Sequence, residues 1–151
     1  MKKLLFIAPI LLFFSCQPEK ASHADSIKNS CLVIKTVVAK NSLIENEFGE
    51  KADWIEIYNN ASHTIDLSKQ QWYVSDDTLM LNKFRLREKQ IPPHTSIKVW
   101  CDDENMVRDQ IHTNFKLSST GETILLSFKD EGDYYIADQL TYTDTQMAVN
   151  P

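Results

Sequence analysis

The stretch D-W-I-E-I-Y-N-N-A-S-H-T-I-D, at residues 53–66, decides the fold. It consists of two short runs of apolar and aromatic residues, and residues 59–62 between them are Asn, Asn, Ala and Ser. Two such runs separated by turn-forming residues are typical of a β-hairpin. The stretch therefore predicts two strands, at 54–58 and 64–67, joined by a turn.

Outward from this hairpin, the chain continues in the same way in both directions. Short runs rich in β-branched and aromatic residues alternate with turn residues, and no segment has a convincing helical period. The three glycines, Gly49, Gly121 and Gly132, all fall in predicted turns, where glycine adopts positive φ without steric cost. This pattern predicts an all-β sandwich or barrel. The further predicted strands are 31–39, 71–75, 83–86, 96–101, 123–128 and 134–142.

The segment 96–101 shows the two-residue period of a strand most clearly. Ile97, Val99 and Cys101 are expected on one face, with Ser96, Lys98 and Trp100 on the other. Two prolines precede the segment, which fits a strand entry because proline cannot donate a hydrogen bond within a ladder.

Four stretches together resemble the lamin-tail domain. They are the hairpin of residues 53–68, W-Y-V-S-D-D at 72–77, I-P-P-H-T-S-I-K-V-W at 91–100 and H-T-N-F-K-L-S-S-T-G-E at 112–122. The resemblance covers about residues 31–142. It implies an immunoglobulin-like β-sandwich of the kind found in nuclear lamins and in many bacterial envelope proteins. The chain departs from that pattern at Lys69 and Gln70, where the family tends to have glycine, and after residue 142.

The first sixteen residues have the composition of an export signal. A basic start with Lys2 and Lys3 is followed by an apolar run at 4–14, and Ser15 and Cys16 close it. The apolar run is too short to span a bilayer, which takes about 20 residues.

The end of this signal resembles a bacterial lipobox, in which the cysteine is diacylated and becomes the new N-terminus. The resemblance implies that Cys16 carries the lipid anchor and that residues 1–15 are removed. The alternative is an ordinary secreted protein in which Cys16 is incidental. The residue after the cysteine is Gln17 and not Asp. In enterobacterial lipoproteins, a residue such as Gln at this position directs the protein to the outer membrane. The polar residues 16–30 then form a tether between the lipid and the domain.

The charge of the chain bears on its partners. Removing residues 1–15, which contain two lysines and no acidic residue, changes the net charge from −5 to −7. An acidic surface repels the phosphate backbone, so nucleic acid is not an expected partner. The one basic cluster, Lys83, Arg85, Arg87 and Lys89, is interpreted as a solvated strand face.

Two cysteines remain once Cys16 is lipidated. In an exported domain, Cys31 and Cys101 can form a disulfide. Alternatively, both are buried thiols that pack as small apolar residues. Spacing alone does not choose between these two outcomes.

A search for catalytic motifs returns no nucleophile elbow and no zinc-binding histidine pair. The four histidines are scattered along the chain. His112 is interpreted as a hairpin residue whose ring bonds the nearby backbone, because it has no evident orienting partner.

Acidic loops are the candidate metal sites. Asp76 and Asp77 follow one predicted strand, Asp102 and Asp103 follow another, and further acids lie in the loop 41–52. Carboxylate oxygens suit Ca²⁺, although no EF-hand loop is present. The simpler interpretation is that these aspartates cap backbone N–H groups in turns, so no cofactor is expected.

Aromatic residues are the candidate ligand contacts. Trp54, Trp72 and Trp100 are expected mostly in the core, where aromatic side chains contribute most burial, although a sugar-binding platform is the alternative. Tyr134 and Tyr135 must point to opposite faces of their strand, so one of them is expected to be exposed and available for a ligand.

These observations predict a signal peptide at 1–15, a lipidated tether at 16–30, one lamin-tail-like β-sandwich at 31–145 and a tail at 146–151. The expected function is a non-enzymatic module of the bacterial cell envelope that binds a protein or glycan or has a structural role. The alternative is a small metal-dependent hydrolase, or an accessory domain of one, that uses the acidic loops.

Overall fold

The computed structural model describes residues 31–143 and 148–149, and this part of the chain contains strands and no helix. The predicted signal peptide, Cys16 and the tether lie outside the described residues. No helix that could cross a membrane is found in the described part.

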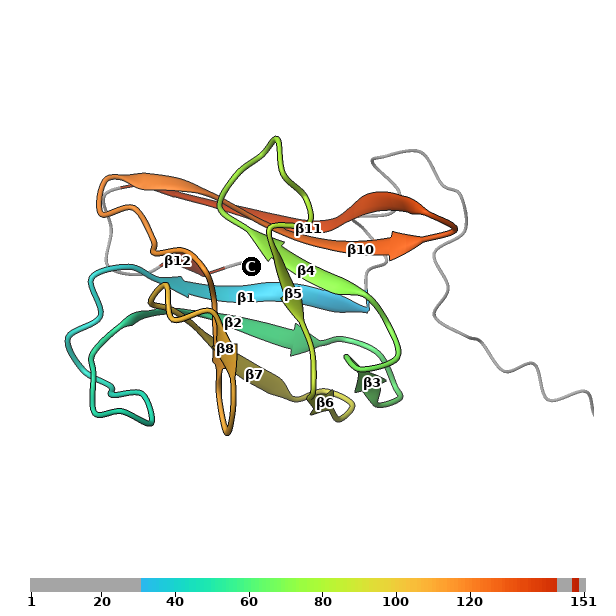
Figure 1. Ribbon diagram of the computed structural model, residues 1–151, viewed down its shortest axis with the longest axis horizontal. Helices are drawn as coiled ribbons and strands as arrows, with labels where there is room; N and C mark the ends of the chain where they lie inside the picture. Colours follow the sequence, from blue (N-terminus) through green and yellow to red (C-terminus); the bar gives the residue numbers. More distant parts are fainter. Residues whose placement is uncertain (1–30, 144–147, 150–151) are drawn as a thin grey trace, which may run out of the picture.

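The strands form two main sheets that pack face to face (Figure 1). One sheet has six strands in the order β12-β1-β2-β7-β9-β8, and the other has four in the order β11-β10-β4-β5. A small third sheet pairs β3 with β6. The all-β, sandwich-like architecture expected from the sequence is therefore confirmed. The strands are β1 (Leu32–Val38), β2 (Asp53–Asn59), β3 (Ile65–Asp66), β4 (Trp72–Ser75), β5 (Phe84–Leu86), β6 (Gln90–Ile91), β7 (Ser96–Cys101), β8 (Met106–Val107), β9 (Ile111–His112), β10 (Gly121–Asp130), β11 (Asp133–Thr143) and β12 (Ala148–Val149).

The core lies between the two main sheets and follows the two-residue period. From β2, Ile55 and Ile57 point inward and are fully buried, and from β7 the inward residues are Val99 and Cys101. Ile97 packs against the same core, so the two faces predicted for 96–101 are confirmed. Burying a side chain of this size stabilises the fold by roughly 1.5–3 kcal/mol.

The eight predicted strands all overlap observed ones, but the predicted hairpin of residues 53–66 is wrong, because β2 pairs with β1 and β7 whereas β3 pairs with β6 in the small third sheet. The four strands that the sequence did not indicate, β6, β8, β9 and β12, are each two residues long, which is too short for a periodic pattern. One of them, β12, lies beyond residue 145, where the domain was expected to end. It pairs with β1 through Ala148 and Val149, so the six-stranded sheet includes residues that had been assigned to a tail.

A carboxylate joins the two main sheets. Asp138 of β11 is buried, and its Oδ2 atom accepts a hydrogen bond of 2.7 Å from the backbone N–H of Ile34 in β1. Strand β1 has a register shift beside Ile34, and the β10–β11 ladder has one beside Leu126, the residue opposite Asp138. β-Bulges bend a strand and change the direction of its polar groups. The irregularities in the β1–β2 and β10–β11 ladders thus lie next to the two residues that form the hydrogen bond between the sheets.

Replacing Asp138 with alanine is expected to lower the free energy of unfolding by about 1.5–3 kcal/mol, because a buried backbone donor loses a charged acceptor. Urea denaturation measures the change. Asp133→Ala is the control, since Asp133 lies on the same strand but is exposed. Equal stability of the two variants would contradict a stabilising role for the Asp138–Ile34 bond.

The structure excludes the disulfide between Cys31 and Cys101. Cys101 is a free thiol buried in the core. Burial raises the pKa of this thiol well above its ordinary value, so the unreactive neutral form persists. Cys101 therefore has the alternative role, that of a small apolar core residue.

Cys101 is accordingly expected to resist iodoacetamide in the folded protein and to react fully after denaturation. Mass spectrometry of the peptide that contains Cys101 measures both states. Rapid alkylation under native conditions would show that the thiol is accessible.

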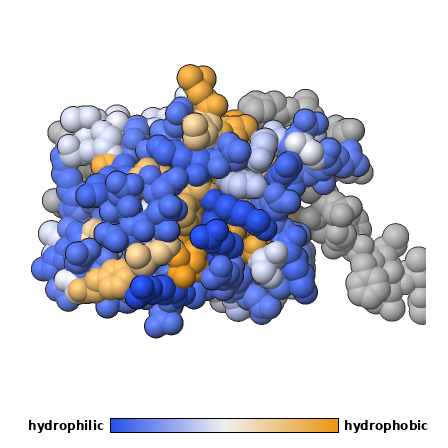
Figure 2. Space-filling model, in the orientation of Figure 1, coloured by the Kyte–Doolittle hydropathy of each residue, from blue (hydrophilic) through white to orange (hydrophobic). Residues whose placement is uncertain are grey.

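The face of the molecule shown in Figure 2 is mostly hydrophilic, with apolar residues gathered at a few points. Among the residues that the structure describes, the most exposed large apolar side chain is Leu79, at 95% exposure, in the loop between β4 and β5. Leu43, in the loop between β1 and β2, is also almost fully exposed.

Candidate functional site

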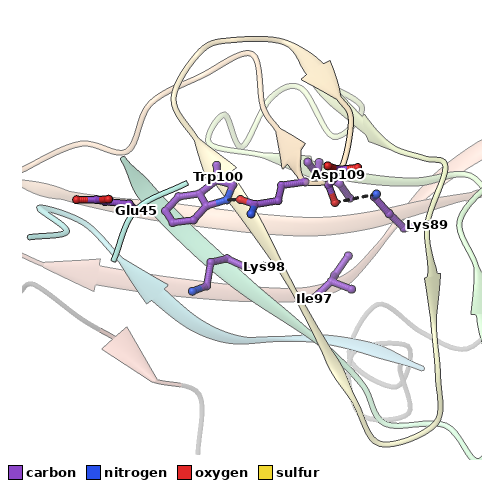
Figure 3. Close-up of a pocket in the computed structure, with 8 residues that line it drawn as sticks. Glu45, Lys89, Ile97, Lys98, Trp100 and Asp109 are labelled. Atoms are coloured by element: carbon purple, nitrogen blue, oxygen red, sulfur yellow. Dashed lines mark hydrogen bonds between the residues drawn. The ribbon is translucent and has the colours of Figure 1, made fainter. Parts of the chain in front are cut away.

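A pocket of about 320 Å³ opens on the six-stranded sheet beside β7 (Figure 3). Its lining combines charged, aromatic and apolar side chains from β7, the β8–β9 hairpin, the loop between β1 and β2, and the segment before β6. These residues are Glu45, Lys89, Ile97, Lys98, Trp100, Asp109, Gln110 and Ile111.

The pocket lies at the edge of β7, where a neighbouring strand ends. Strand β9 runs parallel to β7 but pairs only with Val99 and Trp100. Before Ile111 the chain turns back into β8, and the N–H of Arg108 bonds the carbonyl of Gln110 at 2.9 Å. Ile97 and Lys98 point to opposite faces of β7, yet both line the pocket. Both side chains can line the pocket because it lies along the edge of β7, where the two faces of the strand meet.

One wall is built around Trp100. Its side chain is only 2% exposed, but it lies on the outer face of the sheet, outside the core cluster. The indole Nε1–H donates to Oε1 of Gln110 in the β8–β9 turn. Trp54, the cross-strand partner of Trp100, is also outside the core cluster and is half-buried. Of the three tryptophans that were expected mostly in the core, only Trp72 belongs to the core cluster. Trp100 is buried outside that cluster.

Lysines occupy the faces of the outer aromatic rings. The Nζ atom of Lys98 lies 4.3 Å from the ring centroid of Trp54 and 5.3 Å from that of Trp100. Burial lowers the pKa of Lys98, and Glu56 opposes this shift. Lys35 lies over Tyr58 in the same way, at 5.2 Å. These cation–π contacts place a lysine over one face of each of the rings of Trp54, Trp100 and Tyr58.

A third lysine closes the far side of the pocket. Lys89 Nζ donates to the carbonyl oxygens of Arg108, at 2.6 Å, and Asp109, at 2.9 Å. It therefore ties the segment before β6 to the β8–β9 turn. Lys83 is paired with Asp76 at 2.5 Å. Lys83 and Lys89, two members of the basic cluster that was interpreted as a solvated strand face, therefore each contact a different part of the protein.

Beside the pocket, two asparagines shape the loop that provides Glu45. The side-chain amide of Asn41 donates to the carbonyls of Ile44 and Ala52, at 2.7 and 2.9 Å. The Oδ1 atom of Asn46 accepts from the N–H groups of Phe48 and Glu50. The loop is thus held by its own side chains, as is usual for asparagine in turns.

Beneath this loop lies a buried histidine cluster, which we define as Glu47, Asp102 and His112. His112 is fully buried, and its Nδ1 lies 2.6 Å from Oδ2 of Asp102. Its Nε2 lies 3.6 Å from Oε1 of Glu47, which is beyond hydrogen-bond distance. Among the described residues, neither carboxylate oxygen of Glu47 nor Nε2 of His112 has a hydrogen-bond partner.

The interpretation of His112 from sequence was wrong in one respect. Its ring contacts a carboxylate rather than nearby backbone, so it does have an orienting partner. That partner is Asp102, ten residues away, and no motif spacing links the two. Because the imidazole has no exposed surface, and Phe48 packs against it at 5.1 Å between ring centroids, a solute cannot reach it in this conformation.

The acidic candidates mostly serve turns and ion pairs. Asp77 Oδ1 accepts from the N–H of Leu79 at 2.8 Å, and Asp76 binds Lys83. Asp102 belongs to the histidine cluster, while Asp103 is exposed. In the described part of the chain, no three His, Cys, Asp or Glu side chains are arranged to hold a metal ion.

Tyr134 and Tyr135 point to opposite faces, but neither is exposed. Tyr134 packs against Tyr73 at 5.5 Å and accepts a hydrogen bond from Asn82, and Tyr135 stacks on Phe128 at 5.5 Å. Both side chains are half-buried. Their contacts are those of packed surface residues, so the pocket beside β7 replaces them as the candidate binding site.

No model of a known protein family matches the chain, and no characterised protein matches it in sequence.

Proposed function

We propose that this protein is a lipid-anchored component of the bacterial cell envelope and that it is a binding module rather than an enzyme, with a lamin-tail-like, immunoglobulin-like β-sandwich. The single observation that supports binding most is the open pocket beside β7. Its walls are held in place by hydrogen bonds from Lys89 and Trp100, so they are preorganised. Preorganisation favours affinity because little ordering is needed when a ligand arrives.

The ligand class under this proposal is an envelope protein or glycan. The test is capture of a partner from envelope extracts by the full-length protein and by Glu45→Trp. Glu45 is an exposed residue that lines the pocket, so an indole there fills the pocket without altering the core. Glu50→Trp is the matched control, because Glu50 is an exposed residue of the same loop outside the lining. A partner held by the wild type and Glu50→Trp but lost by Glu45→Trp is expected.

The anchor has its own test. Cys16→Ser is expected to leave a soluble, folded domain, because the lipid on Cys16 is the proposed membrane attachment. Detergent partitioning of the wild type and the variant measures the change. If the variant remains with membranes as strongly as the wild type, Cys16 does not carry the anchor.

A second candidate, a small metal-dependent hydrolase or hydrolase accessory domain, draws support from the Asp102–His112 pair. At metal and catalytic sites, a carboxylate commonly bonds one nitrogen of the imidazole and so fixes the orientation of the ring. Calorimetry with Ca²⁺, Mg²⁺ and Zn²⁺ separates the candidates. Tight stoichiometric binding that Glu47→Gln abolishes would favour the hydrolase.

A further inference from the structure

The loop between β4 and β5 presents two adjacent apolar side chains to solvent. Leu79 is 95% exposed and the next residue, Met80, is 48% exposed. The loop projects from the top of the molecule in Figure 1, and Figure 2 shows hydrophobic residues protruding there. Residues 78–82 contain no ionisable side chain. Exposed apolar groups that lie together, rather than singly, indicate a contact with another molecule or with a membrane.

Hydrogen bonds within the loop hold this apolar apex in place. The Oδ1 atom of Asp77 accepts from the N–H of Leu79 at 2.8 Å, and the carbonyl of Asp77 accepts from the N–H of Met80 at 3.1 Å. At the base of the loop, Asp76 is paired with Lys83 at 2.5 Å. The charged groups beside the apex are therefore engaged within the protein, and the apex keeps its shape without a ligand.

The loop at 41–52 also exposes apolar side chains but differs in its charge. Leu43 is 88% exposed and Phe48 is 44% exposed, but Glu45 and Glu50 are exposed in the same loop. Anionic lipids give a membrane surface a negative potential, which repels carboxylates. Of these two loops, the β4–β5 loop is therefore the one whose chemistry suits a lipid surface.

The size of the apex favours a bilayer over a protein partner. A specific protein interface takes about 20–30 residues from each side, with a complementary surface around its apolar centre. Leu79 and Met80 are two side chains on a projecting loop. A bilayer needs no complementary surface, and a domain that is already tethered to it gains a second contact at a high effective concentration. Two apolar side chains therefore suffice at a bilayer.

We infer that the β4–β5 loop inserts Leu79 and Met80 into the bilayer to which the protein is anchored. This inference rests on the proposed lipid anchor. Cys16 and Cys31 are 15 positions apart, so the chain between them spans at most about 50 Å. A domain of about 100 residues has a radius of gyration of about 13 Å. The tether is thus long enough for any face of the domain to meet the bilayer, and the apolar loop selects the face.

Insertion of this loop sets the direction of the binding pocket. In Figure 1 the β4–β5 loop lies at the top of the molecule, and β7 and β8 lie at the bottom. The pocket is lined by residues of β7 and of the β8–β9 hairpin. It therefore faces away from the bilayer, where an envelope partner can reach it.

The first measurement follows position 79 in the lipidated protein. The full chain is reconstituted in vesicles of phosphatidylethanolamine with a minority of phosphatidylglycerol, and Leu79→Cys is labelled with a nitrobenzoxadiazole probe. Wild type treated in the same way gives the background from the native thiols. The probe at position 79 is expected to emit further to the blue than in the vesicle-free protein and to be quenched by nitroxide-labelled lipids. Leu43→Cys is the matched control, because Leu43 is similarly exposed, and its probe is expected to remain in water.

The second measurement removes the anchor and follows the loop alone. In the Cys16→Ser background, replacing both Leu79 and Met80 with serine is expected to lower the partition coefficient into the same vesicles at least about tenfold, because less apolar area leaves water. Leu43→Ser is expected to leave it unchanged. All three side chains are exposed and lie outside the core cluster, so these substitutions do not alter the core. Sedimentation with the vesicles measures partitioning.

Three results would overturn the inference. The first is a probe at position 79 that behaves in vesicles as the probe at position 43 does. The second is a blue shift that nitroxide lipids do not quench and that grows with the protein-to-lipid ratio, because a second copy of the chain then covers the loop. The third is equal partitioning of the double serine variant and its parent. If wild type stays with the vesicles while position 79 remains in water, the anchor stands and only the loop contact is wrong. If wild type itself is not retained by membranes, the anchor is wrong and the inference falls with it.

Discussion

Replacing His112 with alanine is expected to lower the free energy of unfolding by about 3–5 kcal/mol, because the change leaves a cavity and removes a hydrogen-bond partner from a buried carboxylate. Asp102 lies 2.6 Å from the imidazole, and Glu47 has no other polar partner for its buried oxygens among the described residues. Without the imidazole, Asp102 keeps only the longer contacts, both 3.4 Å, from the side-chain amide of Asn46 and the backbone N–H of Glu104. Chemical denaturation measures the loss.

His63→Ala is the matched control, since its side chain is exposed and a change within about 0.5 kcal/mol is expected there. The double variant His112→Ala, Asp102→Ala separates the cluster from a simple cavity. If the cluster acts as a unit, the double variant is less destabilised than the sum of the single variants. A loss below about 1 kcal/mol in His112→Ala would contradict this account of the cluster.

Gly121→Ala is expected to destabilise the fold by on the order of 3 kcal/mol, because strain and a clash act together. Gly121 begins β10 with φ of 103°, a conformation that side chains disfavour. A Cβ atom there would lie 2.5 Å from the carbonyl oxygen of Tyr142 and 2.7 Å from Cα of Thr143. Both atoms belong to the backbone of the paired strand, so neither can move without distorting the β10–β11 ladder.

Gly132 provides the matched comparison, since its φ is 101° but a Cβ atom would meet nothing within 4 Å. Gly132→Ala therefore measures the strain alone, expected at about 1–2 kcal/mol. The thermal midpoints of the two variants give the difference. If both lose the same stability, the strand yields around the added methyl group and the clash contributes nothing.

The sequence predicted the long strands well, because their residues carry the information locally. Alternation placed Val99 and Cys101 toward the core and Lys98 and Trp100 on the other face, as the structure has them. It could not show that loops would bury Trp100. Side chains on the outer face of a sheet normally remain in contact with solvent. Trp100 is covered only once the β1–β2 loop and the β8–β9 hairpin have folded over it.

The candidate site was largely unpredictable for a related reason. The pocket exists because β9 stops after two residues, and strands of that length leave no periodic signal. The histidine cluster joins Glu47, Asp102 and His112 from three separate segments without a motif spacing. Its one local signal was the acidic composition of the loops, which indicated charge but not the partner. Tyr134 and Tyr135 were placed on the correct opposite faces, but their ring contacts depend on neighbouring strands.

The connection between Asp138 and Ile34 has a kinetic consequence. The two residues are 104 positions apart, and β1 is also paired with β12, over a similar separation. Strand β1 pairs locally with β2, but its contacts with β11 and β12 form only after loops of more than a hundred residues close, and this closure must precede the contacts that compensate for it. Refolding is accordingly expected in the millisecond-to-second range typical of β-sandwiches, with the β1–β12 pairing and the Asp138–Ile34 bond among the last contacts to form.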